Sequence, residues 1–187
     1  MGAIKDDAAW EAAFDFVIRN EGTALSENHN DPGGTTKFGI SQKQYPNLDI
    51  KSLTLEQAKE IYYSDYWIPS RAGLINNIPI ACKYFDFYVN AGPDDAGIVL
   101  QQAINFFIPN KVREDGLVGR KTIEALNELL SARPKHTLHF LLAYAARQWD
   151  KYYRLVSARS QLSAFAFGWT ARAFRIPIGL TEPNSNP

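Results

Sequence analysis

Apolar residues at helical spacing are the feature that most constrains how this 187-residue chain can fold. Within residues 7–20, apolar side chains recur at steps of three and four, which is the spacing of one face of an α-helix. These side chains are Ala9, Trp10, Ala13, Phe14, Val17 and Ile18. Further helices are predicted over residues 54–68, 94–107, 119–132, 135–158 and 161–173. A chain built from these segments should be mainly α.

Residues 79–92, "PIACKYFDFYVNAG", are so apolar that periodicity alone does not decide between a buried strand and a buried helix. Helix is favoured, because apolar side chains here also fall at steps of three and four. Residues 23–52 are instead rich in Asn, Asp, Gly and Pro, which predicts a loop with a short hairpin in "TTKFGIS". We therefore expect a small β element near residues 35–42. No linker interrupts the chain, so one compact body is expected.

Local signals predict where several helices begin and end. Gly22 can end the first helix, and Thr54 with Gln57 three residues later is a capping signal for the second. Pro69 should stop the second helix. Asp94 or Asp95 should cap the helix over residues 94–107.

Charge and cysteine content exclude several classes of function. The net charge is zero, but residues 131–187 carry +6 and residues 1–130 carry −6. The basic part could meet an acidic polymer, a membrane surface or the acidic half of its own chain. No dense run of Lys and Arg argues for a nucleic-acid partner. The single cysteine, Cys82, lies in an apolar context and is expected to be a buried, inert thiol.

Metals, cofactors and membrane insertion are not expected either. The three histidines match no metal-binding spacing, and no cofactor motif is present. The N-terminal residues have no long uncharged apolar core, so no signal peptide is predicted. No stretch reaches the roughly 18 apolar residues of a membrane span. We expect a chain made in the cytoplasm without stable membrane insertion.

Glu21 is the first candidate for catalysis. It follows the apolar stretch "FDFVIRN" at the predicted end of the first helix. Apolar packing and the partial negative charge of a helix C-terminus would both raise the pKa of its carboxyl group. A carboxylic acid that stays protonated near neutral pH is what glycoside hydrolysis needs. The alternative is a solvated glutamate at a helix end.

Asp31 is the second candidate. It precedes Pro32, Gly33 and Gly34 in a turn whose glycines allow a close approach of backbone to a ligand. A carboxylate there could face Glu21 across a cleft and hold or activate a water molecule. The hydroxyls of Thr35 and Thr36 could orient that water. The alternative is that Asp31 only caps its own turn.

Four stretches of the chain resemble glycoside hydrolase family 108, which are lysozyme-like N-acetylmuramidases of phage endolysins and bacterial secretion-linked operons. The stretches are "NEG", "NDPGGTTKFGIS", "YFDFYVNAGP" (with Phe85, Asp86, Asn90 and Gly92) and "FAFGWTAR" (with Gly168, Trp169 and Arg172). The family has Glu-Gly-Gly-Tyr where this chain has Glu21-Gly22-Thr23-Ala24. The resemblance spans nearly the whole chain.

The resemblance implies a lysozyme-like helical fold, with Glu21 as the catalytic acid that cleaves the β-1,4 bond between N-acetylmuramic acid and N-acetylglucosamine. Phage-type lysozymes outside the family space a Glu, an Asp and a Thr similarly to Glu21, Asp31 and Thr36. The expected partner is the glycan strand of peptidoglycan. A holin or a secretion machinery would have to release the enzyme to the cell wall, in the periplasm or outside.

The stretch "EDGLVGRKTIEALN" resembles helical peptidoglycan-binding modules at Asp115, Gly116, Gly119 and Thr122. We therefore expect a lysozyme-like catalytic part in residues 1–92 and a peptidoglycan-binding-like part in residues 93–187, packed into one body. Asp115 and Gly119 are the candidate wall-binding residues. The alternative is a capped turn between a loop and a helix.

Other candidates for substrate contact are Asn90, in the family segment, and two rings. Tyr66 and Trp67 are expected at an exposed helix end, where they could line a sugar cleft. Two alternatives to a hydrolase stay open. One is an inactive peptidoglycan-binding or secretion-accessory protein, and the other is a transglycosylase that keeps Glu21 and forms an anhydro product.

Overall fold

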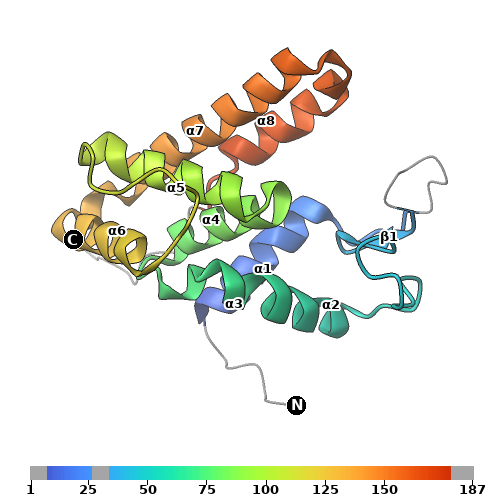
Figure 1. The fold of residues 1–187 in the computed structure, drawn as a ribbon. Helices are drawn as coiled ribbons and strands as arrows, with labels where there is room; N and C mark the ends of the chain where they lie inside the picture. Colours follow the sequence, from blue (N-terminus) through green and yellow to red (C-terminus); the bar gives the residue numbers. More distant parts are fainter. Residues whose placement is uncertain (1–7, 27–33, 178–187) are drawn as a thin grey trace, which may run out of the picture.

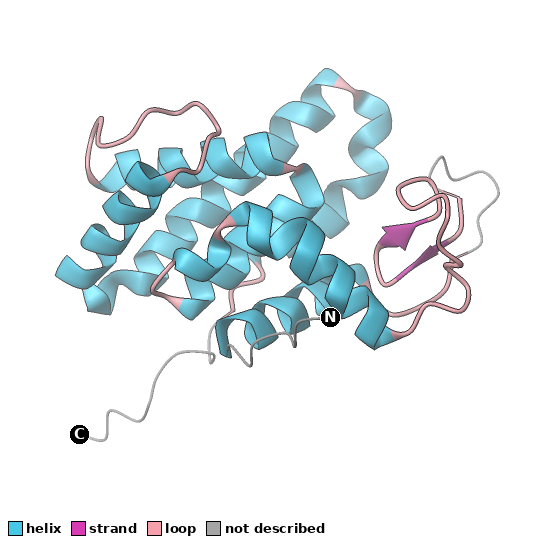
Figure 2. Cartoon of the chain, turned by 60° about the horizontal axis from the view of Figure 1, so that its bottom comes forward, coloured by secondary structure: helices cyan, strands magenta, loops and turns pink. Residues whose placement is uncertain are grey.

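A computed structural model describes residues 8–26 and 34–177 of the chain (Figure 1). The α-helices are α1 (Ala8–Glu21), α2 (Leu55–Tyr62), α3 (Ile68–Ser70), α4 (Ile78–Ala91), α5 (Pro93–Phe107), α6 (Arg120–Ala132), α7 (Thr137–Ala158) and α8 (Ala166–Phe174). A π turn, η1 (Tyr63–Trp67), joins α2 to α3, and short 3-10 turns are η2 (Ala72–Leu74), η3 (Pro134–His136) and η4 (Ser160–Phe165). The antiparallel strands β1 (Thr36–Lys37) and β2 (Ile40–Ser41) form a hairpin at one side (Figure 2). The predicted mainly α fold with a small β element is confirmed.

Helix α4 is the centre of the core. Its residues 79–87 are all buried, and it packs against α1, α5 and α7. A helix that is apolar on every side must be covered on every side. The segment therefore forms the helix that the sequence favoured over a strand. Cys82 is fully buried within it, and burial raises the pKa of its thiol to about 12.

Aromatic rings join α1, α4 and the π turn η1. The ring of Trp67 lies 5.5 Å from that of Trp10 and 5.1 Å from that of Phe85. Trp67 is 4% exposed, so the prediction that it lies at an exposed helix end is wrong. The π turn shifts the register of the helix at this point, which turns Trp67 into the core.

The capping signal at Thr54 is present as a reciprocal pair of hydrogen bonds. The Gln57 amide N donates to Thr54 Oγ1 at 3.2 Å, and the Thr54 amide N donates to Gln57 Oε1 at 2.9 Å. Pro69 does not stop this helix, because the π turn before it already breaks the regular hydrogen-bond pattern. The helix continues to Ser70 and ends at Arg71, whose φ is 59°.

The start of α5 also differs from the prediction. Neither Asp94 nor Asp95 is the N-cap; Gly92 is, at a φ of 88°, and Pro93 is the first helical residue. Proline fits this position because its missing amide hydrogen has no helical partner there. The two aspartates lie in the first turn instead, where carboxylates interact favourably with the helix dipole.

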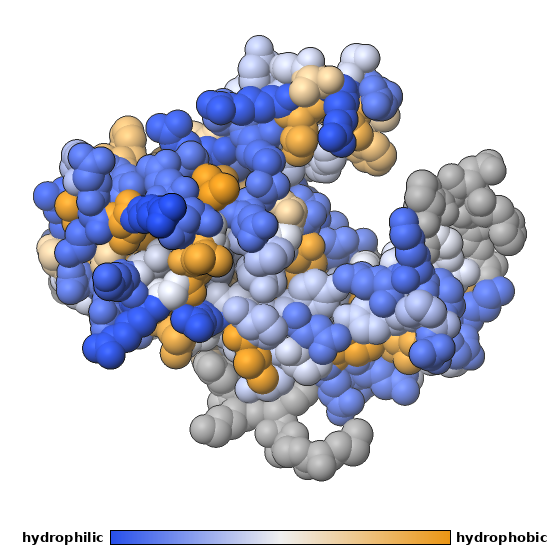
Figure 3. Space-filling view, in the orientation of Figure 1, coloured by the Kyte–Doolittle hydropathy of each residue, from blue (hydrophilic) through white to orange (hydrophobic). Residues whose placement is uncertain are grey.

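Helices α7 and α8 form a hairpin that extends away from the body, joined by η4 (Figure 1). Helix α8 packs along α7, and its C-terminal end returns to α1 and α4. Figure 3 shows a hollow between the end of this hairpin and the side of the molecule that carries β1. The C-terminal end of α1 lies between these two parts (Figure 1).

Candidate active site

Glu21 is the last residue of α1. Gly22 ends the helix at a φ of 81°, and its amide N donates to the Ile18 carbonyl at 2.8 Å. The Glu21 side chain is 22% exposed, so it is partly buried yet reachable. The predicted placement of this carboxyl group at the helix end therefore agrees with the structure.

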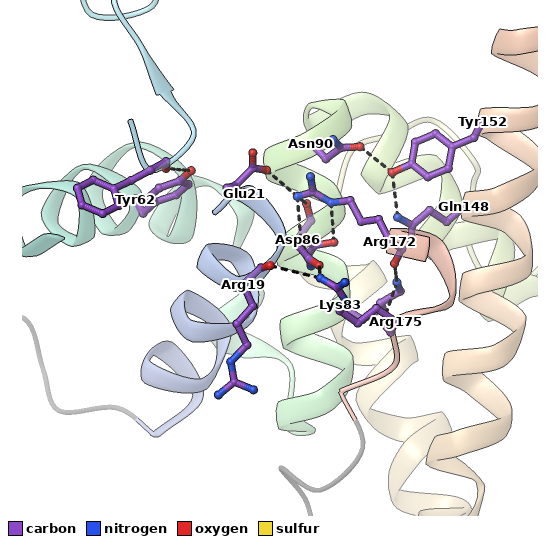
Figure 4. A network of polar contacts seen from close by, with 12 residues as sticks. Arg19, Glu21, Tyr62, Lys83, Asp86, Asn90, Gln148, Tyr152, Arg172 and Arg175 are labelled. Atoms are coloured by element: carbon purple, nitrogen blue, oxygen red, sulfur yellow. Dashed lines mark hydrogen bonds and ion pairs between the residues drawn. The ribbon is translucent and has the colours of Figure 1, made fainter. Parts of the chain in front are cut away.

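The surroundings of the Glu21 carboxyl group are more polar than the sequence predicted. Arg172 of α8 donates from Nη2 to Glu21 Oε1 at 2.8 Å (Figure 4). In the sequence, Arg172 stands out only as part of a motif and not as a site residue. It lies 151 positions from Glu21, so no local spacing pattern brings the two together.

Asp86 of α4 holds the other side of the same guanidinium group. Arg172 Nε donates to Asp86 Oδ2 at 3.1 Å and Nη2 donates to Oδ1 at 2.8 Å. Asp86 is fully buried, which a carboxylate tolerates only when it is paired. Burial opposes the charge on Arg172, but Asp86 and Glu21 outweigh it and raise the pKa of the guanidinium.

The β hairpin closes over Glu21 at Gly39. Its φ is 77°, and a Cβ atom there would lie 2.9 Å from Glu21 Cγ and 2.6 Å from Tyr62 Oη. Tyr62 Oη in turn donates to the Phe38 carbonyl at 2.9 Å. Burial raises the pKa of Tyr62, so its hydroxyl stays protonated and can donate. Only glycine fits between the hairpin, α1 and α2.

The predicted catalytic partners of Glu21 are Thr36, in the hairpin, and Asp31, which precedes it in the sequence. Thr36 is in β1, and its backbone pairs with Ser26 through hydrogen bonds of 2.8 and 2.9 Å. Its hydroxyl donates to the Gly34 carbonyl at 3.5 Å. Asp31 lies outside the described residues. The roles of Thr36 and Asp31 stay predictions.

Tyr66 is the ring candidate that stays near Glu21. It is partly exposed, and its ring lies 5.5 Å from that of Tyr62, the residue that contacts Gly39. Gln44 donates from Nε2 to the Tyr66 hydroxyl. Trp67, by contrast, lies in the core.

Two family models match the chain, one over the part that carries Glu21 and one over the part that carries Arg172. Residues 14–92 match the family model described as Glycosyl hydrolase 108. These residues belong to that family. Residues 96–174 match the model described as Predicted Peptidoglycan domain. The glycosyl hydrolase 108 assignment makes the chain a glycoside hydrolase that acts on peptidoglycan.

A solved structure, described as that of SagA from Brucella abortus, matches with a TM-score of 0.66. It is 23% identical, and the match covers 90% of this chain and 91% of that chain. At this identity the likeness shows the fold alone. A search of curated proteins found no match.

Asn90 lies one helical turn after Asp86 on α4, at the edge of the glycosyl hydrolase 108 region. It is exposed, and its Oδ1 accepts a hydrogen bond of 2.6 Å from the Tyr152 hydroxyl of α7 (Figure 4). The Tyr152 ring stacks on Trp169 of α8 at 5.0 Å. Asn90 thus joins the glycosyl hydrolase 108 region to the α7–α8 hairpin.

Asp115 and Gly119 lie in the segment between α5 and α6, on the side of the molecule away from β1 (Figure 1). Asp115 Oδ1 accepts from Gln101 Nε2 at 2.9 Å and from the Leu117 amide N at 3.0 Å. The hydrogen bond from Gln101 is the main cause that lowers the pKa of Asp115. Gly119 is the N-cap of α6. These contacts stabilise the turn, and wall binding by the two residues stays a prediction.

Metal binding and membrane insertion can be examined for the residues that the structure describes. Within residues 8–26 and 34–177, no group of three or more His, Cys, Asp or Glu side chains could hold a metal ion. None of the helices formed by these residues is both long and apolar enough to cross a membrane.

Proposed function

We propose that this glycoside hydrolase is an N-acetylmuramidase, with Glu21 as the general acid for the β-1,4 bond between N-acetylmuramic acid and N-acetylglucosamine. The observation that carries the proposal is the setting of Glu21. Its partly exposed carboxyl group lies between the β hairpin and the α7–α8 hairpin, and is fixed by Gly39 and Arg172. A fixed carboxyl group beside a hollow can meet the oxygen between two sugars.

In this mechanism the protonated Glu21 carboxyl group gives its proton to the glycosidic oxygen as the bond to the sugar breaks. Asp31 then holds or activates the water that attacks the sugar, and Thr36 orients that water. General acid catalysis supplies roughly a hundred- to ten-thousand-fold of rate. Glycoside hydrolysis uses a pair of carboxyl groups in this way.

The test is digestion of purified peptidoglycan sacculi by wild-type protein and by Glu21→Gln. Glutamine keeps the size of the side chain but has no acidic proton, so release of fragments should fall at least about a hundredfold. Glu11→Gln is the matched control on the same helix, where Glu11 pairs with Lys59 on the surface. It should keep wild-type activity.

Mass spectrometry of the released fragments separates the alternatives. Reducing N-acetylmuramic acid ends support the muramidase, and anhydro ends would identify a transglycosylase. Binding to sacculi without release of fragments would identify an inactive binding protein. Equal activity of wild-type and Glu21→Gln proteins would remove Glu21 from the mechanism.

The proposal extends to the organisation of the chain and its access to the wall. Residues 1–92 would carry the catalysis, and residues 93–187 would contact glycan strands through Asp115 and Gly119. Sedimentation of Asp115→Asn with sacculi tests that contact, and unchanged binding would limit Asp115 to the turn. Release through a holin or a secretion machinery would bring the enzyme to the wall. Lysis of cells that express the chain without such a partner would contradict this route.

A further inference from the structure

The guanidinium group of Arg172 is fixed independently of Glu21. Asp86 contacts it through two nitrogens, at 3.1 and 2.8 Å, and the Arg172 side chain is only 10% exposed. Such a two-point contact sets the plane of the guanidinium as well as its position. Asn20, the residue before Glu21, donates to Asp86 Oδ1 at 2.8 Å. Helices α1, α4 and α8 therefore meet at one buried carboxylate.

The backbone at the end of α8 is held to the same helices. Lys83 of α4 donates from Nζ to the carbonyls of Arg172 at 2.8 Å and Arg175 at 3.2 Å (Figure 4). Arg175 donates from Nη1 to the Arg19 carbonyl at 3.3 Å and contacts Asn20 Oδ1. Both the side chain and the main chain of Arg172 are thus placed relative to α1, which ends in Glu21.

A single hydrogen bond then connects this fixed group to Glu21. The same Nη2 atom that bonds Asp86 donates to Glu21 Oε1 at 2.8 Å. Because the N–H of Arg172 points at Glu21 Oε1, an acidic proton on Oε1 could not point back at Arg172. A protonated carboxyl group has one hydroxyl and one acceptor oxygen, so the contact distinguishes the two oxygens.

We propose that Arg172 is the positioning residue of Glu21: it holds Oε1 as an acceptor, so that the proton resides on Oε2 and is donated from there. This inference rests on the proposed role of Glu21 as general acid. Arg172 falls in the residues 96–174 that match the peptidoglycan domain, whereas Glu21 falls in the glycosyl hydrolase 108 region. The second region therefore completes the active centre of the first. The competing role for Arg172 is neutralisation of Asp86 alone.

The test is the kinetics of Arg172→Lys on peptidoglycan fragments. The lysine ammonium keeps a positive charge beside Asp86 but has no planar fork to reach both carboxylates. We expect kcat to fall by about tenfold to a hundredfold, as for a misplaced catalytic group, with KM nearly unchanged. Arg154→Lys is the matched control, because Arg154 of α7 also pairs with a carboxylate, Asp150 at 3.0 Å, but belongs to no contact that places Arg172 or Glu21. It should keep the wild-type kcat.

A second measurement tests the contact without relying on activity. The shift in Tm caused by Arg172→Lys is measured in the wild-type chain and in Glu21→Gln. If Arg172 acts on Glu21, the two shifts differ, because contacting residues are not additive. If the chain cleaves no peptidoglycan, the proposed function fails, while this comparison still decides whether Arg172 and Glu21 are coupled.

Three results would overturn the proposal: wild-type kcat in folded Arg172→Lys, an equal loss in Arg154→Lys, or equal Tm shifts in the two backgrounds. If Arg172→Lys does not fold, Asp86→Asn replaces it. This change leaves Glu21 and Arg172 in place but weakens the anchor of the guanidinium. It should also lower kcat more than KM, and an unchanged kcat would equally exclude a positioning role.

Discussion

At the scale of single residues, Gly39 determines how closely the β hairpin approaches Glu21. A side chain there would meet Tyr62 Oη at 2.6 Å and Glu21 Cγ at 2.9 Å. Gly39→Ala should therefore move the hairpin or the carboxyl group, and we expect turnover of sacculi to fall at least about tenfold, since small displacements of a catalytic group are costly.

Gly92→Ala is the matched control for this change. Gly92 has a similar positive φ of 88°, but no atom lies within 4 Å of the place that its Cβ would take. Both variants place a side chain at a positive φ, and the backbone strain of about 1–3 kcal/mol lowers Tm. Only Gly39→Ala should also lose activity. Equal activities of the two variants would show that the contact with Glu21 is unimportant.

What the sequence could predict at this scale depended on distance along the chain. The end of α1 at Glu21 and Gly22 is a local feature, so apolar spacing and one glycine were sufficient. The contact with Arg172 forms only when α8 returns to α1 after 151 positions, and no local pattern encodes it. Trp67 was misplaced because a π turn changes the helical register on which the prediction relied.

At the scale of elements, Lys83 couples the docking of α8 to pH. It is 1% exposed, and burial lowers its pKa to about 8, while the Asp86 carboxylate opposes this shift. Between about pH 8 and the usual lysine value of about 10.4, the unfolded chain binds a proton that the folded chain has lost. The free energy of unfolding should therefore rise with pH through this window. Below about pH 8, Lys83 is protonated in both states and contributes no pH dependence.

The comparison of wild-type protein with Lys83→Met isolates this contribution from other titrating groups. From about pH 7.5 to about pH 9.5, the free energy of unfolding of the wild type should increase by about 2 kcal/mol relative to the variant. Urea unfolding at the two pH values measures the difference. A constant or shrinking difference would mean that folded Lys83 keeps its proton up to the higher pH, so that burial does not lower its pKa.

The elements themselves were predictable where apolar spacing extends over several turns. Helices α1, α6 and α7 follow from it, and for α4 the apolar steps of three and four favoured a helix over a buried strand. The start of α5 was less predictable, because an aspartate is favourable both as the N-cap of a helix and in its first turn. At α5 the positive φ of Gly92 and the fixed ring of Pro93 decide the start instead.

At the scale of the whole molecule, the two family regions share one core. Phe87 of α4 packs against Tyr144 and Tyr152 of α7, with ring centroids 6.3 and 5.8 Å apart. Opening this interface would expose the apolar side chains of α4 to water and break the ion pair between Asp86 and Arg172. Both losses destabilise the separated regions, so neither region should unfold alone.

We therefore expect one cooperative thermal transition for the whole chain. The double variant Trp149→Phe and Trp169→Phe keeps only Trp67, which lies in the glycosyl hydrolase 108 region, and Trp10, whose ring packs against that of Trp67. Its fluorescence therefore reports on this region. Far-UV circular dichroism of the same sample reports on all helices, including α5 to α8. Coincident midpoints are the signature of a two-state transition. Midpoints that differ would show that residues 96–174 melt separately, and that the contact between Arg172 and Glu21 can be lost while the helix carrying Glu21 stays folded.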